Sequence, residues 1–145
     1  MIPDLDPKIG YLTPGIHGAS WCDIVGHFGG NSHRERLLEA LLAACCNLAA
    51  AGCKELLLDG SFVTAKALPG DYDATWQTMG VDLNRLDPVL LDLRHPRAAM
   101  KTKYLGDLFP ASIHAVPGVL FRDFFFTDRN GVRKGVVLID LGSLP

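Results

Sequence analysis

Residues 54–76 read KELLLDGSFVTAKALPGDYDATW, and the interpretation of the chain starts from this stretch. Its first six residues, 54–59, contain three consecutive leucines and predict a short strand that is buried on both faces. Gly60 and Ser61 follow this strand directly. Glycine lets a ligand approach the backbone closely, and residues 61–67 are expected to form a brief helix whose first N–H groups point toward an incoming phosphate.

A pair of aspartates opens a second expected strand, residues 71–76. Asp71 and Asp73 are two positions apart, and strand residues with this spacing project side by side from one face. Two such carboxylates suit Mg²⁺, which binds one or two carboxylates and leaves its other positions to water and substrate phosphates. The hydroxyl and N–H groups of a Gly-Ser turn bind those phosphates. The stretch therefore indicates nucleotide chemistry.

The spacing of Gly60-Ser61 and Asp71-Tyr72-Asp73 resembles the signature of the DNA polymerase β-like nucleotidyltransferase superfamily, including its minimal and toxin–antitoxin-associated members. A wider pattern resembles a poorly characterised bacterial family of nucleotidyltransferase-like proteins; it runs from Trp21 through Asn31 and Arg34 to Lys134-Gly135-Val136. The superfamily resemblance implies a minimal α+β domain, with a mixed β-sheet and helices packed mainly on one face.

The resemblance also implies roles for individual residues. Ser61, after Gly60, would contact the β- and γ-phosphates of ATP or another nucleoside triphosphate, while Asp71 and Asp73 would hold Mg²⁺ and align an attacking hydroxyl with the α-phosphate. Lys66 lies near the place where relatives often carry a basic residue that steadies the triphosphate. A solvated lysine fits the sequence equally well.

A third carboxylate is expected from a later strand, and two aspartates are candidates. Asp140 is preferred over Asp123, because Ile139 and Leu141 flank Asp140 and predict a buried charge that needs a metal or a partner. The alternative is that Asp140 only ends a strand. If neither aspartate completes the site, a binding role becomes the better interpretation.

The bulk composition places the chain in a broad class. Its 145 residues predict a globular domain over residues 21–145, preceded by an extended arm over residues 1–20 that is rich in Pro and Gly. The formal charge of −2 gives no general attraction to nucleic acid, so any RNA binding would be local. No signal-peptide pattern or long apolar run is present, which predicts a cytoplasmic protein without a membrane partner.

The four cysteines have no zinc-ligand spacing. They are expected to be reduced and mostly buried thiols, because free cysteine behaves as a small hydrophobic residue.

Hydrophobic spacing predicts the remaining elements. Helices are expected over residues 21–28 and 33–51, the second with Ser32 as its N-cap, and two short helices between residues 80 and 103. A hairpin is expected near the C-terminus, where an Asn-Gly turn joins an aromatic-rich strand to a β-branched one; these strands comprise residues 119–127 and 135–141 and should extend the sheet.

Two basic features allow a functional or a structural interpretation. Arg34, in the first turn of a helix where the dipole disfavours cations, either reaches a phosphate or carboxylate or is a solvated surface residue. One basic cluster either receives a triphosphate or RNA backbone or is a charged solvent face; it comprises Arg94, His95, Arg97, Lys101 and Lys103.

The sequence predicts two classes of function. The first is an Mg²⁺-dependent enzyme that moves a nucleotidyl group from a nucleoside triphosphate to a hydroxyl of RNA, protein or a small molecule, with the acceptor held by a partner chain or across a homo-oligomer interface. The second is a non-catalytic protein of the same fold, such as the antitoxin or regulatory component of a bacterial toxin–antitoxin or phage-defence system. Three clustered acids would favour the enzyme.

Overall fold

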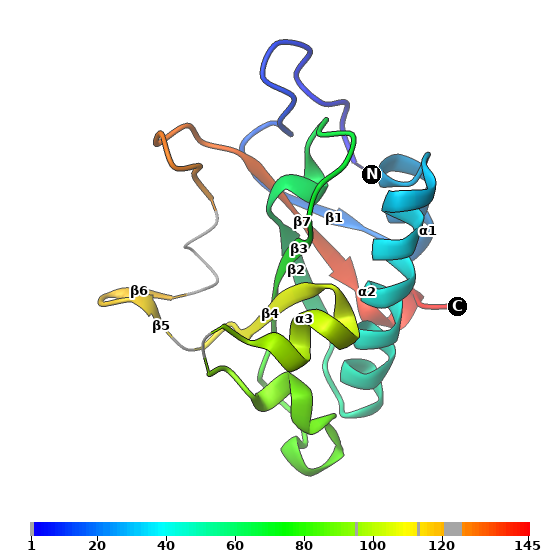
Figure 1. Ribbon diagram of the computed structural model, residues 1–145, viewed down its shortest axis with the longest axis vertical. Helices are drawn as coiled ribbons and strands as arrows, with labels where there is room; N and C mark the ends of the chain where they lie inside the picture. The colour runs from blue at the N-terminus through cyan, green and yellow to red at the C-terminus, as the bar shows by residue number, and fades with distance from the viewer. Residues whose placement is uncertain (1, 95, 113, 121–125) are drawn as a thin grey trace.

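A computed structural model of the chain describes residues 2–94, 96–112, 114–120 and 126–145. Its centre is a five-stranded mixed sheet in the order β1-β7-β2-β3-β4 (Figure 1). The strands are β1 (Gly15–Ala19), β2 (Glu55–Asp59), β3 (Tyr72–Trp76), β4 (Gly106–Pro110) and β7 (Gly135–Asp140). A separate two-stranded ribbon is formed by β5 (His114–Val116) and β6 (Val119–Leu120).

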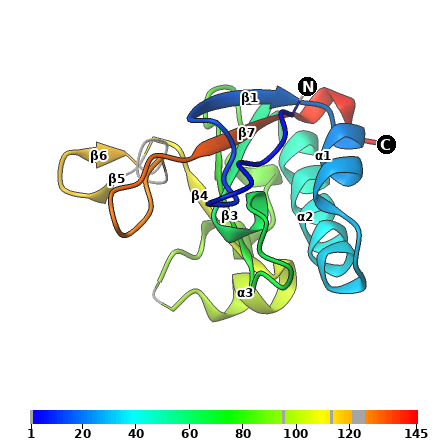
Figure 2. The same ribbon diagram turned by 90° about the horizontal axis from the view of Figure 1, so that it is seen from above.

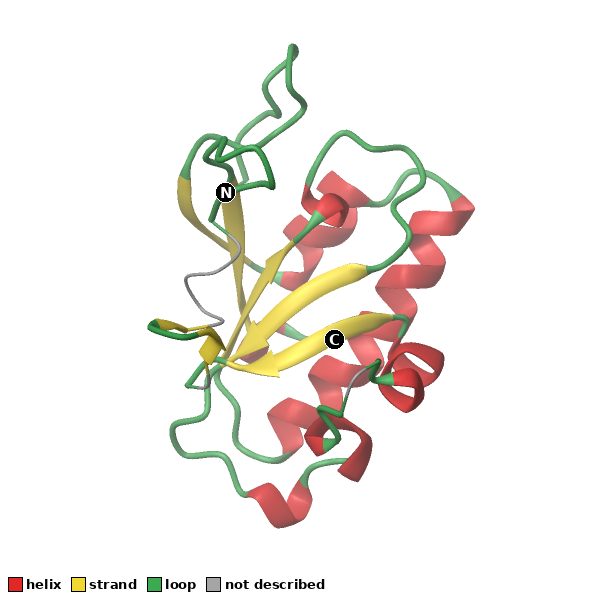
Figure 3. Cartoon of the chain, turned by 60° about the vertical axis from the view of Figure 1, so that its left-hand side comes forward, coloured by secondary structure: helices red, strands yellow, loops and turns green. Residues whose placement is uncertain are grey.

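The helices pack on one face of this sheet. They are α1 (Trp21–Phe28), α2 (Ser32–Ala50) and α3 (Ala98–Tyr104). Short 3-10 turns η1 (Ser61–Val63), η2 (Leu83–Arg85), η3 (Pro88–Leu91) and η4 (Leu141–Ser143) complete the described elements. The β5–β6 ribbon projects to the side opposite α1 and α2 (Figure 2), and the sheet stands in front of the helices in Figure 3. The predicted α+β class, with a mixed sheet, is confirmed.

The helix caps explain where the first two helices begin. Ser20 forms a capping box with Asp23 at the start of α1. Asn31, rather than the predicted Ser32, is the N-cap of α2, because its side-chain oxygen accepts the Arg34 N–H at 2.8 Å. The apolar side chains of α2 are buried as predicted; these include Leu37, Leu38, Leu41, Cys45 and Leu48. None of the helices in the described ranges has the length and apolarity needed to cross a membrane.

Two predicted segments have a different structure. Part of the expected arm, Gly15–Ala19, is β1, an edge strand that pairs in parallel with β7. Of the two short helices expected between residues 80 and 103, the first is the 3-10 turn η3, whereas the second is the α-helix α3. All four cysteines are free thiols, but only Cys45 and Cys53 are buried, so the prediction that most are buried is wrong.

The C-terminal hairpin prediction is correct for one strand. The returning strand is β7, which pairs antiparallel with β2 and extends the sheet as expected. Residues 119–120 begin the other predicted strand of the hairpin, and their predicted pairing with β7 is wrong. They pair with β5 across a turn at Gly118, whose φ is +82°. The turn before β7 is closed by Asp128, whose side chain accepts the Asn130 N–H at 2.8 Å. Residues 121–125, including Asp123, lie outside the described residues.

Candidate carboxylate site

A row of aspartates crosses three adjacent strands. Asp59 at the end of β2 pairs in register with Asp73 on β3, and Asp73 pairs in register with Asp107 on β4. Side chains in register on neighbouring strands lie on the same face of a sheet. Three carboxylates therefore project from one face, directly beside the Gly60 turn. Sequence analysis did not single out Asp59 or Asp107.

Asp59 and Asp73 are desolvated acids. The side chain of Asp59 is 0% exposed, and neither carboxylate oxygen has a hydrogen-bond partner within the described ranges. Burial raises the pKa of Asp59, and the Asp73 charge raises it further, while Lys134 opposes both effects. Burial, together with the charges of Asp71 and Asp107, raises the pKa of Asp73 to about 7. Such a pair needs a proton or a cation, because uncompensated buried charges are costly.

Asp71 lies at the mouth of this site, one residue before β3. Burial raises its pKa, followed by the Asp107 charge, whereas Lys101 and Lys66 lower it. Asp71 also borders a cavity of about 190 Å³ whose wall contains His33, Arg36 and Lys101 among others. The carboxylate row thus opens toward a group of cationic side chains.

The turn after β2 requires glycine. Gly60 has a φ of +80°, and a Cβ at this position would collide with the Asp73 carboxylate. Glycine therefore permits both the backbone conformation and the close approach of the turn to Asp73. Ser61 follows as the first residue of η1, which ends at Val63 rather than continuing to residue 67 as predicted.

Arg34 explains why the segment after η1 is not helical. Its guanidinium is buried and donates hydrogen bonds to four backbone carbonyls: Phe28 (3.1 Å), Phe62 (2.8 Å), Thr64 (2.8 Å) and Lys66 (2.6 Å). Three of these carbonyls belong to residues 62–66, where they replace the helical acceptor pattern. The interpretation of Arg34 as a solvated surface residue is wrong, because the residue is only 6% exposed and its guanidinium binds backbone carbonyls rather than a described carboxylate. The helix-dipole conflict at its position was the available signal that this arginine has a special partner.

The N-terminus of α2 therefore holds the whole loop between β2 and β3. Asn31 donates from Nδ2 to the Ala67 carbonyl at 2.9 Å, and His33 Nε2 hydrogen-bonds with the Pro69 carbonyl. Lys66 has an exposed side chain, and its charge lowers the pKa of Asp71. The loop is fixed by its backbone while the Lys66 ammonium remains accessible near the carboxylates.

Asp107 already has cationic partners. Arg97 Nε donates to its carboxylate at 2.9 Å, and Lys101 Nζ lies 3.6 Å from it. Other members of the predicted basic cluster pair elsewhere: Arg94 with Asp92 and Lys103 with Asp87. His95 lies outside the described residues. The described part of the cluster is thus divided among separate ion pairs, and Arg94, Lys101 and Lys103 are exposed, as the interpretation of a charged solvent face predicts.

Asp140 does not belong to this site. On β7 it pairs in register with Glu55, whereas Asp59 lies at the other end of β2. Four residues of strand separate the two positions, about 13 Å at 3.3 Å per residue. Asp140 is exposed and caps η4 by accepting the Gly142 N–H at 2.8 Å. The prediction that Asp140 joins Asp71 and Asp73 is wrong, and the interpretation that it ends a strand is correct.

A family model matches residues 3–140 of the chain. The chain belongs to DUF6932, a family of unknown function. No curated protein and no solved structure matches it. Membership in DUF6932 therefore indicates no particular activity.

The donor chemistry of this DUF6932 member fits Mg²⁺. Asp59 supplies two buried oxygens that have no hydrogen-bond partner in the described part of the chain, and Asp71 and Asp73 are acids whose pKa values are raised mainly by burial. Among the described side chains no group of three His, Cys, Asp or Glu is placed to hold a metal ion. Mg²⁺ does not require such a cage, because it takes one or two protein carboxylates together with water and phosphate oxygens. Asp71 and Asp73 would hold the ion, with Asp59 behind them.

Proposed function

We propose that the chain is an Mg²⁺-dependent nucleotidyltransferase, which moves a nucleotidyl group from a nucleoside triphosphate to a hydroxyl of RNA, protein or a small molecule. One observation carries this proposal: Asp59, Asp73 and Asp107 are in lateral register on one face of the sheet, next to the Gly60 turn. Buried carboxylates beside accessible lysine and arginine side chains suit an anionic ligand that binds together with a divalent metal ion.

In this reaction the acceptor oxygen bonds to the α-phosphorus and the bond from that phosphorus to the bridging oxygen breaks, so that pyrophosphate leaves. The proton of the acceptor hydroxyl is released to solvent. Asp71 and Asp73 would hold Mg²⁺, which would supply neutralisation of the charge that develops on the phosphates. The Ser61 hydroxyl and Lys66 would contact the leaving phosphates, and Arg36 and Lys101 border the cavity into which those phosphates would extend. Arg34 acts as a positioning residue, because it fixes the loop that carries Lys66.

Thermal unfolding tests the binding step. A ligand at one hundred times its Kd stabilises the native state by about 2.7 kcal/mol, which corresponds to a Tm increase of about 5–10 °C for a domain of this size. We expect this increase with Mg²⁺ plus a nucleoside triphosphate, but not with either one alone. Asp71→Asn and Asp73→Asn should lose the increase.

Asp140→Asn is the matched control, because it removes an acid at the opposite end of the sheet. This variant should retain the full Tm increase. A wild-type protein whose Tm is unaffected by all four triphosphates, each tested with Mg²⁺, would contradict the proposal.

The second candidate is a non-catalytic binding or regulatory protein of the same fold. The observation that favours it is that Asp107 is already occupied by Arg97 and Lys101 and would have to leave them to approach a cation. Transfer of label from α-³²P-labelled triphosphates to bacterial RNA or protein separates the two candidates. The enzyme transfers label, and the Asp73→Asn variant does not; the binding protein retains the Tm increase without any transfer.

A further inference from the structure

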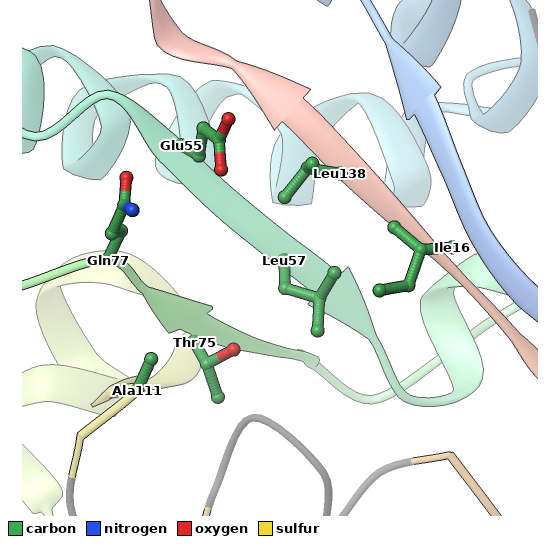
Figure 4. Close-up of a pocket in the computed structure, with 7 residues that line it drawn as sticks. All are labelled: Ile16, Glu55, Leu57, Thr75, Gln77, Ala111 and Leu138. Atoms are coloured by element: carbon green, nitrogen blue, oxygen red, sulfur yellow. The ribbon is translucent and has the colours of Figure 1, made fainter.

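The sheet face that carries the aspartates also contains a cavity of about 180 Å³ (Figure 4). Its lining comes from four strands and the residues beside them: Ile16, Glu55, Leu57, Thr75, Gln77, Ala111 and Leu138. Leu57 lies in the middle of the group, with Glu55 and Gln77 together at one end (Figure 4). The cavity therefore has apolar walls and one polar end, and it has the size of a planar ring system rather than of a larger molecule.

The cavity lies farther along β3 from the carboxylate row, on the same face of the sheet. Asp71, Asp73, Thr75 and Gln77 are alternate residues along β3 and its flanks, so they follow one another on the same face. Thr75 lies about 7 Å beyond Asp73 and Gln77 about 13 Å beyond it, at 3.3 Å per residue. This spacing matches a nucleotide whose α-phosphate lies at Asp73, whose ribose passes Thr75 and whose base reaches Gln77. The cationic cavity at Asp71 lies in the opposite direction, where the leaving phosphates would extend.

Three polar side chains in the cavity have no side-chain hydrogen-bond or ion-pair partner among the described residues. The Thr75 hydroxyl is buried, with the residue 2% exposed, and its oxygen has no hydrogen-bond partner within the described part of the chain. A buried hydroxyl without a partner is uncommon and indicates an absent ligand or water. Glu55 and Gln77 have exposed or partly exposed side chains, and neither forms a side-chain hydrogen bond or ion pair with another described residue.

We propose that this cavity binds the base of the triphosphate and selects guanine, an inference that rests on the proposed function. A carboxylate only accepts hydrogen bonds, whereas an amide side chain both donates and accepts. The Watson–Crick edge of guanine presents two adjacent donors, N1–H and the N2 amino group, beside the O6 acceptor. Glu55 complements the two donors, and the Gln77 amide donates to O6.

The other bases fit this end less well. Adenine and cytosine each place a ring-nitrogen acceptor beside their amino group, and that acceptor would face the Glu55 carboxylate. Uracil offers a single donor between two acceptors. The leucine and isoleucine side chains would contact the faces of the ring.

Calorimetric titration of the full chain with Mg²⁺ and each triphosphate tests the inference, with inosine triphosphate as a probe that lacks only the N2 amino group. GTP should bind about ten- to hundredfold more tightly than ATP, CTP or UTP, as expected for one well-placed bidentate contact. Inosine triphosphate should bind more weakly than GTP. In Glu55→Gln the difference between GTP and inosine triphosphate should shrink, while Glu39→Gln, an exposed glutamate on α2, should retain it.

Each outcome separates this inference from the proposed function. Tight binding of all triphosphates without base preference, or a preference for another base, overturns the guanine site and leaves the proposed function standing. Failure to bind any triphosphate overturns both. The comparison of GTP with inosine triphosphate uses the wild-type protein, so it decides the question even if Glu55→Gln does not fold.

Discussion

Replacing Asp73 by asparagine should make the protein more stable at pH 8. Burial and the neighbouring Asp71 and Asp107 charges raise the pKa of Asp73 to about 7, whereas an aspartate in an unfolded chain titrates near 3.9. Between these values the folded state holds a proton that the unfolded state releases. Stability therefore falls as pH rises through this window, which is the reverse of the usual behaviour of an ion-paired aspartate.

The magnitude follows from the difference in pKa. About three pKa units at 1.36 kcal/mol per unit correspond to about 4 kcal/mol of stability lost between pH 4 and pH 8. Asparagine has nearly the same size as aspartate and carries no charge. We therefore expect Asp73→Asn to exceed the wild-type free energy of unfolding by at most about 4 kcal/mol at pH 8, and to converge with it near pH 4.

Urea denaturation at pH 4, 6 and 8 in the presence of a chelator measures this difference. Asp140→Asn, at the other end of the sheet, should retain the wild-type decline with pH. Addition of Mg²⁺ together with a nucleoside triphosphate at pH 8 should stabilise the wild type and leave Asp73→Asn unaffected, because the bound cation offsets the same repulsion that the substitution removes. A variant that is less stable than the wild type at pH 8, or a stability difference between variant and wild type that does not grow from pH 4 to pH 8, would refute the reasoning.

Two further substitutions test the loop beside the aspartates. Arg34→Lys should lower the free energy of unfolding by about 3–5 kcal/mol, because an ammonium group cannot donate to the four carbonyls that the guanidinium binds. A free energy of unfolding, measured by urea denaturation, within about 1 kcal/mol of the wild-type value would contradict this role of Arg34. Gly60→Ala should cost more than Gly131→Ala, because a Cβ at residue 60 meets Asp73 and because φ of +80° with ψ of −168° is a conformation that only glycine adopts readily, whereas Gly131 has a similar φ of +78° with nothing within 4 Å. Equal losses in the two glycine variants would show that the close approach to Asp73 is unimportant.

Much of the fold could be predicted from local patterns. The span of α1 was predicted to the residue, and α2, β2 and β3 within one residue at each end, because hydrophobic spacing and a following glycine act over a few neighbouring residues. The N-cap of α2 was misplaced by one position, since Asn31 and Ser32 are both good caps and only the backbone conformation distinguishes them.

Strand pairing was less predictable. No strand was expected at residues 106–110, because Gly106 and Pro110 bound a segment of only five residues. Without β4 there was no reason to place Asp107 beside Asp73. Asp140 was therefore predicted as the third carboxylate. Its apolar neighbours in the sequence suggest that it is buried, but they point to the other face of the strand.

The special role of Asp59 and Arg34 is a property of the tertiary structure. Asp59 follows three leucines, and in the sequence it resembles the end of a strand. Only the fold shows that it is a buried acid, in register with Asp73 and without a hydrogen-bond partner among the described residues. Arg34 reads as a surface residue because its four acceptors are backbone carbonyls, which leave no pattern in a sequence.

Paramagnetic broadening by Mn²⁺ in NMR spectra of the ¹⁵N-labelled protein, recorded with a nucleoside triphosphate, tests the carboxylate site most directly. At substoichiometric Mn²⁺ the amide signals of Asp59, Ser61, Asp71, Asp73 and Asp107 should broaden first, while that of Asp140 at the far end of the sheet should remain sharp. Broadening that is centred on Asp140, or that leaves the signals around Asp73 unchanged, would contradict the proposed site.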